Sequence, residues 1–410
     1  YILFKVSGII SSGTMWDQKT HIEHGDITLA GQSSPQGVIL GSLYNQKKYA
    51  DMYDNGSAHV NNIIIRHIRT RPHGISNALD DCIRLIDSQN VIIDHSSFQW
   101  ATDEVMEINS NKNFTIQNSI FAETLGSHND RGGILIKYAK DNFPNTNISF
   151  HHNTISRIGG RLPQLSPNSS QIGTGIDIEI SNNLIWDPGS TKGVIKGSYI
   201  TNWVTESQEY YDFYCRLNYV NNYSFTLDSD SREDKWINVG NFAVKHIDSR
   251  LYSTGNQMNI FDDEDRVKND DDLGQVLSGR LDFPEITYTN TEDLMDYMVE
   301  NAGAFPRDTM DNRFIDYIKS REIDKTPCDE KGADDAYTFT YNQMPIPPLD
   351  SDDDGMPDWW EIHNGLNPLV KESNGSELSM LYYGVEGYDN VEVYLNSLSD
   401  NLVSGKSLTL

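Results

Sequence analysis

A short apolar pattern repeats five times between residues 63 and 185. Each copy has two apolar residues one position apart, then a polar corner, then another apolar pair. The copies begin at Ile63, Val91, Phe114, Ile148 and Ile178, at spacings of 28, 23, 34 and 30 residues. Such self-similarity is typical of solenoids, in which each coil buries its apolar face against its neighbours. We predict an all-β protein folded as a right-handed parallel β-helix.

The polar corners carry small side chains in the same register as the apolar anchors. Five residues after each of the last four anchors come Ser96, Ser119, Asn153 and Asn183. Hydroxyl and amide groups at one turn position can form a hydrogen-bonded ladder between coils. We therefore predict a ladder at this corner, and loops on one side of the solenoid in the insertions 124–146 and 159–175.

Composition divides the chain into three regions. We predict a β-helix over residues 1–261, an acidic cap over 262–345, with a helix whose N-cap is Thr291, and a small calcium-loop and helical module over 346–410. Because the chain opens directly in an apolar strand, we expect a processed or truncated product.

Charge is spread unevenly over the 410 residues. The net charge is -28, but residues 1–200 hold 16 Lys and Arg against 18 Asp and Glu, which leaves -26 for the remainder. An acidic C-terminal half argues against nucleic acid or an anionic membrane as partner. No apolar run approaches the roughly 18 to 20 residues of a membrane helix. We expect a monomer that neither binds nucleic acid nor inserts into a membrane.

Three acids in the repeat region are candidate metal ligands. Asp103 and Glu107 are four residues apart in a stretch with strand character, so they would share one face. Asp81 begins the preceding strand-like run and would stack beside them. Such a cluster repels itself unless a cation or shared protons neutralise it.

A second acidic pattern lies near the C-terminus and has the spacing of an EF-hand calcium loop. Its predicted ligands, with Gly355 at the sharp turn, are Asp350, Asp352, Asp354, Met356, Asp358 and Glu361. The segment resembles the thrombospondin type 3-like modules of secreted bacterial polysaccharide-degrading enzymes. This resemblance implies a structural calcium ion.

Several motifs in the first half resemble those of polysaccharide lyase family 1, the pectate lyases. They are the run 90–104 with its Ile-Asp-His core, residues 65–72, residues 150–153 and the Arg-Leu-Pro of 161–163. The resemblance covers roughly residues 1–190. It implies a secreted or cell-surface bacterial enzyme that cleaves a polyuronate such as pectate by calcium-dependent β-elimination.

The same resemblance implies roles for individual residues. The catalytic calcium would be held by Asp81, Asp103 and Glu107, with Asp80 or Glu104 assisting, and Arg161 would abstract the proton. The family's substrate-binding lysine is expected just after His128, where this chain offers Arg131 or Lys137 instead. Further implied substrate contacts are His152 and Arg157. Gln164 stands where the family often has another arginine.

Two other functions remain open from the sequence. One is an inverting β-helix hydrolase of the polygalacturonase kind, with Asp80 and Asp81 as acid and base. The other is a noncatalytic β-helix that binds acidic glycans or acts as an adhesin. The Gly-His-Gly and Arg-Ile-Lys motifs of polygalacturonases are missing. The departures from the pectate lyase motifs near Gln164 and residue 130 are consistent with a noncatalytic protein.

Overall fold

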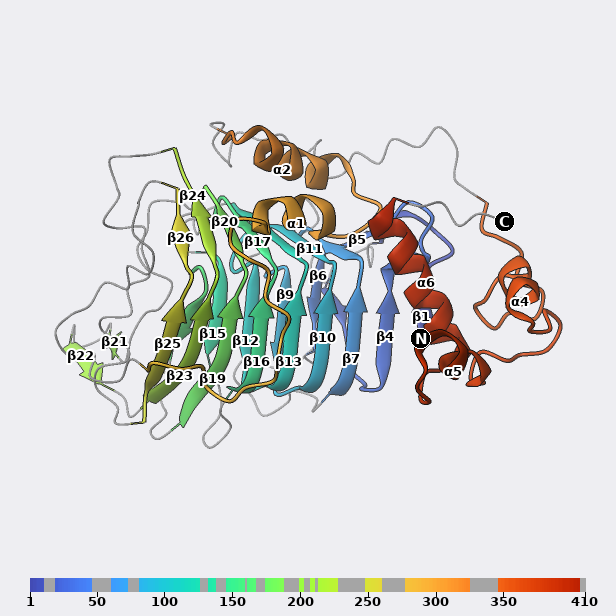
Figure 1. Cartoon of the computed structure of the whole chain (residues 1–410), viewed down its shortest axis with the longest axis horizontal. Coiled ribbons are helices and arrows are strands. Elements are labelled where there is room, and N and C mark those ends of the chain that lie inside the picture. Colours follow the sequence, from blue (N-terminus) through green and yellow to red (C-terminus); the bar gives the residue numbers. More distant parts are fainter. Residues whose placement is uncertain are drawn as a thin grey trace.

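The protein is described by a computed structural model over residues 1–10, 19–45, 60–72, 81–125, 132–137, 145–158, 161–166, 174–187, 199–202, 207–210, 213–227, 248–259, 277–324 and 346–405. Three sheets of parallel strands wind around one core, and each of the first six coils has one strand from each sheet (Figure 1). Connections between parallel strands are almost always right-handed. The architecture is the predicted right-handed parallel β-helix.

Two of the sheets have nine strands each. The strands of sheet A are β1 (Ile2–Leu3), β4 (Ile27–Ala30), β7 (Asn61–Arg66), β10 (Gln89–Asp94), β13 (Lys112–Gln117), β16 (Asn145–His151), β19 (Thr174–Ser181), β23 (Phe213–Val220) and β25 (Arg250–Thr254). The strands of sheet B are β2 (Gly8–Ile10), β5 (Val38–Leu40), β8 (Ile68–Thr70), β11 (Ser97–Ala101), β14 (Ile120–Thr124), β17 (Thr154–Ser156), β20 (Leu184–Trp186), β24 (Tyr223–Phe225) and β26 (Gln257–Met258).

Sheet C has six strands in the described residues and completes the triangle of the first six coils. They are β3 (Lys19–His21), β6 (Ser42–Tyr44), β9 (Ile83–Ile86), β12 (Met106–Asn109), β15 (Ile134–Lys137) and β18 (Gln164–Ser166). The sequence pattern did not reveal this sheet. Strands β15 and β18 lie inside the insertions 124–146 and 159–175, which are therefore not loops throughout. A separate antiparallel pair is formed by β21 (Tyr199–Asn202) and β22 (Ser207–Tyr210).

The five predicted anchors stack in register in sheet A. Val91 pairs with Ile63 and with Phe114, and the series continues through Ile148 to Ile178. Each anchor is at most 1% exposed. The anchors stack because an in-register parallel pairing places every equivalent apolar side chain at the same depth, inside the solenoid.

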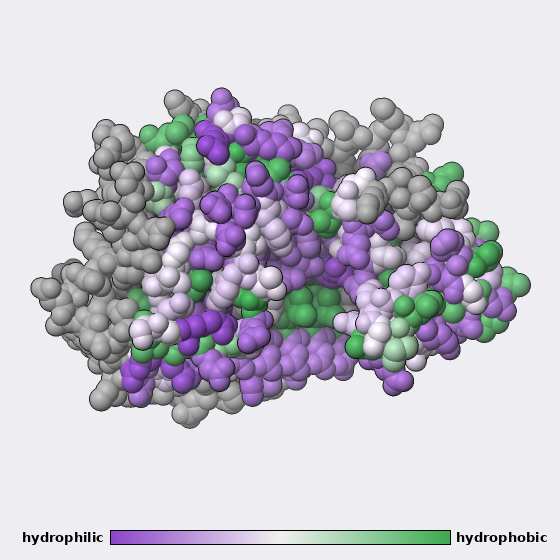
Figure 2. All heavy atoms as spheres, in the orientation of Figure 1, coloured by the Kyte–Doolittle hydropathy of each residue, from purple (hydrophilic) through white to green (hydrophobic). Residues whose placement is uncertain are grey.

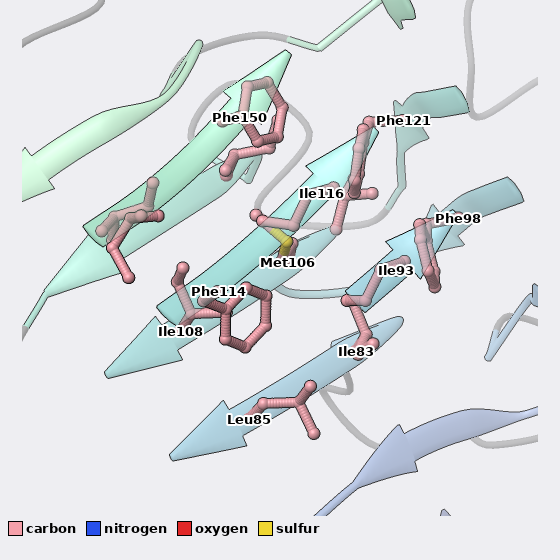
Figure 3. Close-up of a cluster of buried hydrophobic side chains, with 14 of the residues drawn as sticks. Ile83, Leu85, Ile93, Phe98, Met106, Ile108, Phe114, Ile116, Phe121 and Phe150 are labelled. Atoms are coloured by element: carbon pink, nitrogen blue, oxygen red, sulfur yellow. The ribbon is translucent and has the colours of Figure 1, made fainter. Parts of the chain in front are cut away.

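Aromatic and aliphatic side chains from all three sheets fill the interior (Figure 3). Phe98 of sheet B stacks on Phe121 at 5.1 Å between ring centroids, and Phe121 lies 5.6 Å from Phe150 of sheet A. Sheet C adds Ile83, Leu85, Met106 and Ile108. One continuous core therefore runs along the axis, and only side chains that point outward from the sheets can form a functional site.

The predicted ladder is present at the corner between sheets A and B. The backbone N–H of Ser96 donates to Ser119 Oγ, that of Ser119 to Asn153 Oδ1, and that of Asn153 to Asn183 Oδ1. Two residues that the repeat did not supply, Asn222 and Asn256, continue it. Buried backbone donors at this corner are thereby satisfied by side chains of the next coil.

Two helices cover the outer face of sheet B. They are α1 (Leu294–Asn301) and α2 (Thr309–Ser320), whose apolar residues pack on Trp100, Ile120 and Trp186. The helix expected from Thr291 begins later, with Asp293 at the N-cap position, because the Thr291 hydroxyl donates to the Gly255 carbonyl instead. The predicted cap 262–345 is thus described only over 277–324, where it lies along the solenoid (Figure 1).

The C-terminal residues 346–405 lie against the N-terminal end of the solenoid (Figure 1). They contain α4 (Asp358–Asn364), α5 (Glu377–Tyr383) and α6 (Asn390–Ser404), and they share a buried cluster with Leu3 and Ala30 near the short helix η1 (Gly31–Ser33). Hydrophobic side chains gather on the outer surface of this module, whereas most of the solenoid face in view is hydrophilic (Figure 2). None of the helices in the described ranges is long and apolar enough to cross a membrane.

Replacing Asn153 should destabilise the β-helix strongly. The side chain is fully buried, accepts the Ser119 N–H and donates to the Ile116 carbonyl. Asn153→Ala leaves these groups unsatisfied, so we expect the free energy of unfolding to fall by about 3 kcal/mol in denaturant titrations. Asn113→Gly is the control, because Asn113 is exposed with a φ of 52° that glycine tolerates, and its two hydrogen bonds, to Asn90 and from Asn147, lie at the surface where water can replace them. A comparable loss in both variants would contradict a special role for the buried ladder.

Candidate active site and second cation site

Three buried carboxylates converge where sheet B passes into sheet C. Asp81 precedes β9, Glu104 lies in the corner between β11 and β12, and Glu107 lies in β12. A ligand oxygen of each lies within 4.8 Å of one from the other two. They are 2%, 7% and 3% exposed. Carboxylates this close and this buried need positive charge to remain ionised.

Asp103 is not part of the tight group. Residues 102–105 form the corner between the strands, so Asp103 and Glu107 do not share a strand face as expected. Asp103 is half-buried and its charge acts on Arg161, as does that of Asp81. Glu104, which the sequence suggested only as an assistant, is the third member of the cluster instead. Asp80 lies outside the described residues.

Sequence reasoning missed Arg84 at this site. The Arg84 guanidinium donates from Nη2 to Glu107 Oε1 at 2.8 Å, and its Nη1 lies 3.6 Å from Asp81 Oδ2. The signal was available in the register, because Arg84 pairs directly with Glu107 once β9 and β12 are stacked. Finding it required knowledge of sheet C, which the apolar repeat did not give.

Arg161 approaches the acids from the turn before β18. Its φ is 60°, in the left-handed region, and its guanidinium contacts the Glu104 carboxylate. Burial lowers the pKa of Arg161, while the charges of Asp103 and Asp81 oppose that shift. A lowered pKa is the direction that a proton-abstracting arginine needs. The structure thus brings Arg161 to the acids, as the sequence predicted.

The four predicted substrate-binding residues lie in different places relative to the acid cluster. Arg131 lies outside the described residues. Lys137 ends β15, where its backbone pairs with Asn109, two residues beyond Glu107. That position is on the same sheet as the acid cluster, so Lys137 remains a candidate by register.

His152 and Arg157 are not brought to the acids. His152 lies at the corner between sheets A and B, where Thr289 bonds its Nε2 and Tyr297 covers its ring. Arg157 follows β17 and pairs with Asp324 at 3.0 Å beneath α2. Both are thus covered by residues 277–324, a packing that the sequence pattern could not show.

A second group of carboxylates forms the predicted loop before α4. Oxygens of Asp350, Asp352 and Asp354 lie within 4.8 Å of one another. Glu361 is completely buried, and neither its two oxygens nor the two of Asp352 have a hydrogen-bond partner. Four orphaned carboxylate oxygens in one loop fit an oxygen-coordinated cation.

Two other predicted loop ligands have separate outcomes. The Asp358 carboxylate accepts hydrogen bonds from the backbone N–H and the hydroxyl of Ser351, both at 2.7 Å, so it braces the loop, and its charge also acts on Glu361. Met356 is buried and its N–H donates to Asp354 Oδ1. The predicted role of its carbonyl stays a prediction.

The loop also contacts the first coil of the β-helix. Lys5 Nζ lies 3.3 Å from Asp350 Oδ2 and 3.4 Å from Asp353 Oδ1. Gly355 has a φ of 99° and sits against Leu3, whose Cδ2 would be 3.1 Å from an added Cβ. The geometry of the loop is therefore linked to the packing at the open end of the solenoid.

Comparison with known proteins finds relatives that share one name and have low sequence identity to this chain. The chain is 25% identical over 97% of its length to a protein named probable pectate lyase C of Aspergillus flavus, of which 83% is covered. A protein of the same name from Emericella nidulans is 24% identical over 97% of this chain and 82% of that protein. These relatives are fungal, so the expected bacterial origin finds no support in them. No family model matches the chain.

Among solved structures, the chain is similar to a pectate lyase from Paenibacillus sp. 0602. The two share 13% identity with a TM-score of 0.42, over 75% of this chain and 82% of the other. A pectate lyase bound to a hexasaccharide gives 13% identity and a TM-score of 0.38, over 65% and 66%. The β-helix itself rests on the strand pairing described above.

The loop should make metal-free stability depend on pH through Glu361. Burial, followed by the charges of Asp354 and Asp352, raises the pKa of Glu361 to about 7. A raised carboxyl pKa stabilises the fold below the unfolded pKa, and this contribution is lost as pH rises through about 7. In chelator, the Tm of the natural protein should therefore fall between about pH 5 and 8, and Glu361→Gln should flatten that fall. Identical Tm profiles for the two proteins would contradict this assignment.

Proposed function

We propose that this protein is a calcium-dependent polysaccharide lyase of the pectate lyase type, acting on a polyuronate by β-elimination. The supporting observation is the convergence of Asp81, Glu104 and Glu107 with Arg161 at one corner of a parallel β-helix. The similarity to proteins named pectate lyase over nearly the whole chain agrees with it. Such an enzyme acts outside the cell, so we also propose secretion.

The charges at the corner fit one divalent cation. The acids Asp81, Asp103, Glu104 and Glu107 outnumber the guanidinium groups of Arg84 and Arg161 by two. Oxygen ligands from carboxylates are those that Ca²⁺ prefers. Asp81, Glu104 and Glu107 would hold the ion, with Asp103 as the remaining predicted ligand.

Each residue at the corner has a distinct role in the proposed elimination. Bound calcium would neutralise the sugar carboxylate and so acidify the proton on the neighbouring carbon. Arg161 would take that proton at a guanidine nitrogen after the guanidinium has given up its own, and burial shifts its pKa in that direction. The electron pair of the broken C–H bond then forms the carbon–carbon double bond and expels the glycosidic oxygen, which takes a proton from water. Glu104 accepts a hydrogen bond from the guanidinium and so orients it. Lys137 is the proposed contact for a substrate carboxylate.

The spacing of the acids disfavours the hydrolase alternative. An inverting hydrolase keeps its two carboxyl groups roughly 6.5 to 9.5 Å apart to admit a water molecule. One carboxylate oxygen each of Asp81, Glu104 and Glu107 lies within 4.8 Å of the others, while Asp80, the other acid of the hydrolase alternative, lies outside the described residues. Their geometry therefore supports shared cation binding over an acid and base pair.

Replacing Arg161 should abolish elimination and spare the fold. With polygalacturonate and calcium, the natural protein should form unsaturated product that absorbs in the ultraviolet, and Arg161→Ala or Arg161→Lys should lower kcat by roughly 10² to 10⁴. Arg216→Ala is the control, because Arg216 pairs with Asp177 on sheet A, away from this corner.

The same assay separates the three functions. Absorbing product that disappears in chelator supports the lyase. New reducing ends without absorbance would establish hydrolysis instead. Absence of any product, together with retained binding of polygalacturonate, would establish a glycan-binding protein. Activity that survives in Arg161→Ala would overturn the assignment of the base.

We also propose that the C-terminal loop holds a structural calcium ion, with Asp350, Asp352, Asp354, Met356 and Glu361 as its ligands. The loop packs on Leu3 and pairs with Lys5, so an ordered loop stabilises the first coil. The ion would act by closing the end of the solenoid, and it would take no part in the reaction.

Calcium should therefore stabilise the whole protein through this loop. At a calcium concentration 100 times the Kd, the expected gain is about 2.7 kcal/mol in the free energy of unfolding. Asp352→Asn with Glu361→Gln should remove most of the calcium-dependent rise in Tm and speed hydrogen exchange in β1 and β2 of the first coil. Asp353→Asn is the matched control, since Asp353 is 82% exposed in the same loop. Equal calcium responses in the double variant and the control would contradict a structural ion.

A further inference from the structure

Arg84 occupies a position between two of the proposed ligands. It lies in β9, its side chain is 10% exposed, and its register partner across the sheet is Glu107. Asp81 precedes the same strand by two residues. One guanidinium therefore reaches a carboxylate of its own coil through Nη1, at 3.6 Å, and one of the next coil through Nη2, at 2.8 Å.

The two carboxylates that Arg84 touches also accept hydrogen bonds from other groups of the corner. Glu107 Oε1 receives Arg84 Nη2 and also Asn109 Nδ2, at 2.7 Å. Asp81 Oδ1 receives the backbone N–H of Glu104 at 3.1 Å. Two donors on a single Glu107 oxygen fix the plane of that carboxylate, which determines where its second oxygen points.

Arg84 can influence a bound cation in two opposite ways. Its positive charge repels a cation and would weaken binding. Its planar fork of donors holds two carboxylates from separate coils in one arrangement, which would strengthen binding. The observed contacts favour the second effect, since one guanidinium makes a hydrogen bond to Glu107 and an ion pair with Asp81, which belong to successive coils.

We propose that Arg84, assisted by Asn109, is a positioning residue that preorganises Asp81 and Glu107 for the divalent cation. This inference rests on the proposed function. Arg84 touches neither the substrate nor the proton that is transferred. Its contribution is to the affinity for calcium, and the rate at saturating calcium depends on it weakly.

The test measures calcium binding separately from activity. In full-length protein that carries both Asp352→Asn and Glu361→Gln, which together remove the proposed loop site, calorimetry reports calcium binding at the corner alone. Adding Arg84→Met should raise the Kd roughly 10- to 100-fold, the usual cost of losing a group that orients a metal ligand. Arg84→Lys keeps the charge without the fork and should raise it at least as much. Arg216→Met is the control and should leave the Kd unchanged.

Kinetics provide the second measurement. If the protein with Asp352→Asn and Glu361→Gln does not fold, the Arg84 variants are measured in the otherwise natural protein. The calcium concentration for half-maximal activity should rise by the same factor in both Arg84 variants, while kcat at saturating calcium changes less than about threefold. Calcium binding in Arg84→Met as tight as in its parent, or full recovery in Arg84→Lys, would show that Arg84 acts only as a counter-charge. Calcium binding without lyase activity in the parent would overturn the proposed function and leave the positioning role to be decided by the Kd values.

Discussion

In-register pairing of successive coils is the constraint on which the rest of this structure depends. It stacks Ile63, Val91 and Phe114 inside the solenoid, and by strand alternation it also lines up the residues that point outward. The pairing of Arg84 with Glu107 follows from the same register in sheet C. A slip of one residue would invert every side chain, so the core that fixes the register also fixes the site.

Buried carboxylates gather at two places in the molecule. The corner between sheets B and C gathers acids with two arginines, and the C-terminal loop gathers acids whose buried oxygens have no partner in Asp352 and Glu361. The first arrangement is partly neutralised by the chain itself, whereas the buried oxygens of the second fit the external cation that we propose for it. This difference agrees with a working site at the corner and a structural site in the loop.

The added segments close the surfaces that a bare solenoid would expose. Helices α1 and α2 cover Trp100 and Trp186 on sheet B, and the C-terminal module packs on Leu3 at the open end. Arg69 is fully buried where it pairs with Asp311 of α2. Sheet C is the face on which the acids and Arg161 meet, so the coverings leave the proposed chemistry to that side.

The sequence by itself determined the parallel coils and the Ser and Asn ladder, because both follow from a spacing that recurs in each coil. It also determined the acids of the C-terminal loop, because their spacing is set within one short segment. It also indicated Asp81, Glu107 and Arg161 through motifs. Only the tertiary structure decided that Glu104 joins the cluster, since residues 102–105 turn a corner that a strand pattern cannot express. Likewise, the burial of His152 and Arg157 depends on residues 277–324, which lie more than 100 positions away in the chain. Contacts of that separation follow from packing, which no local pattern encodes.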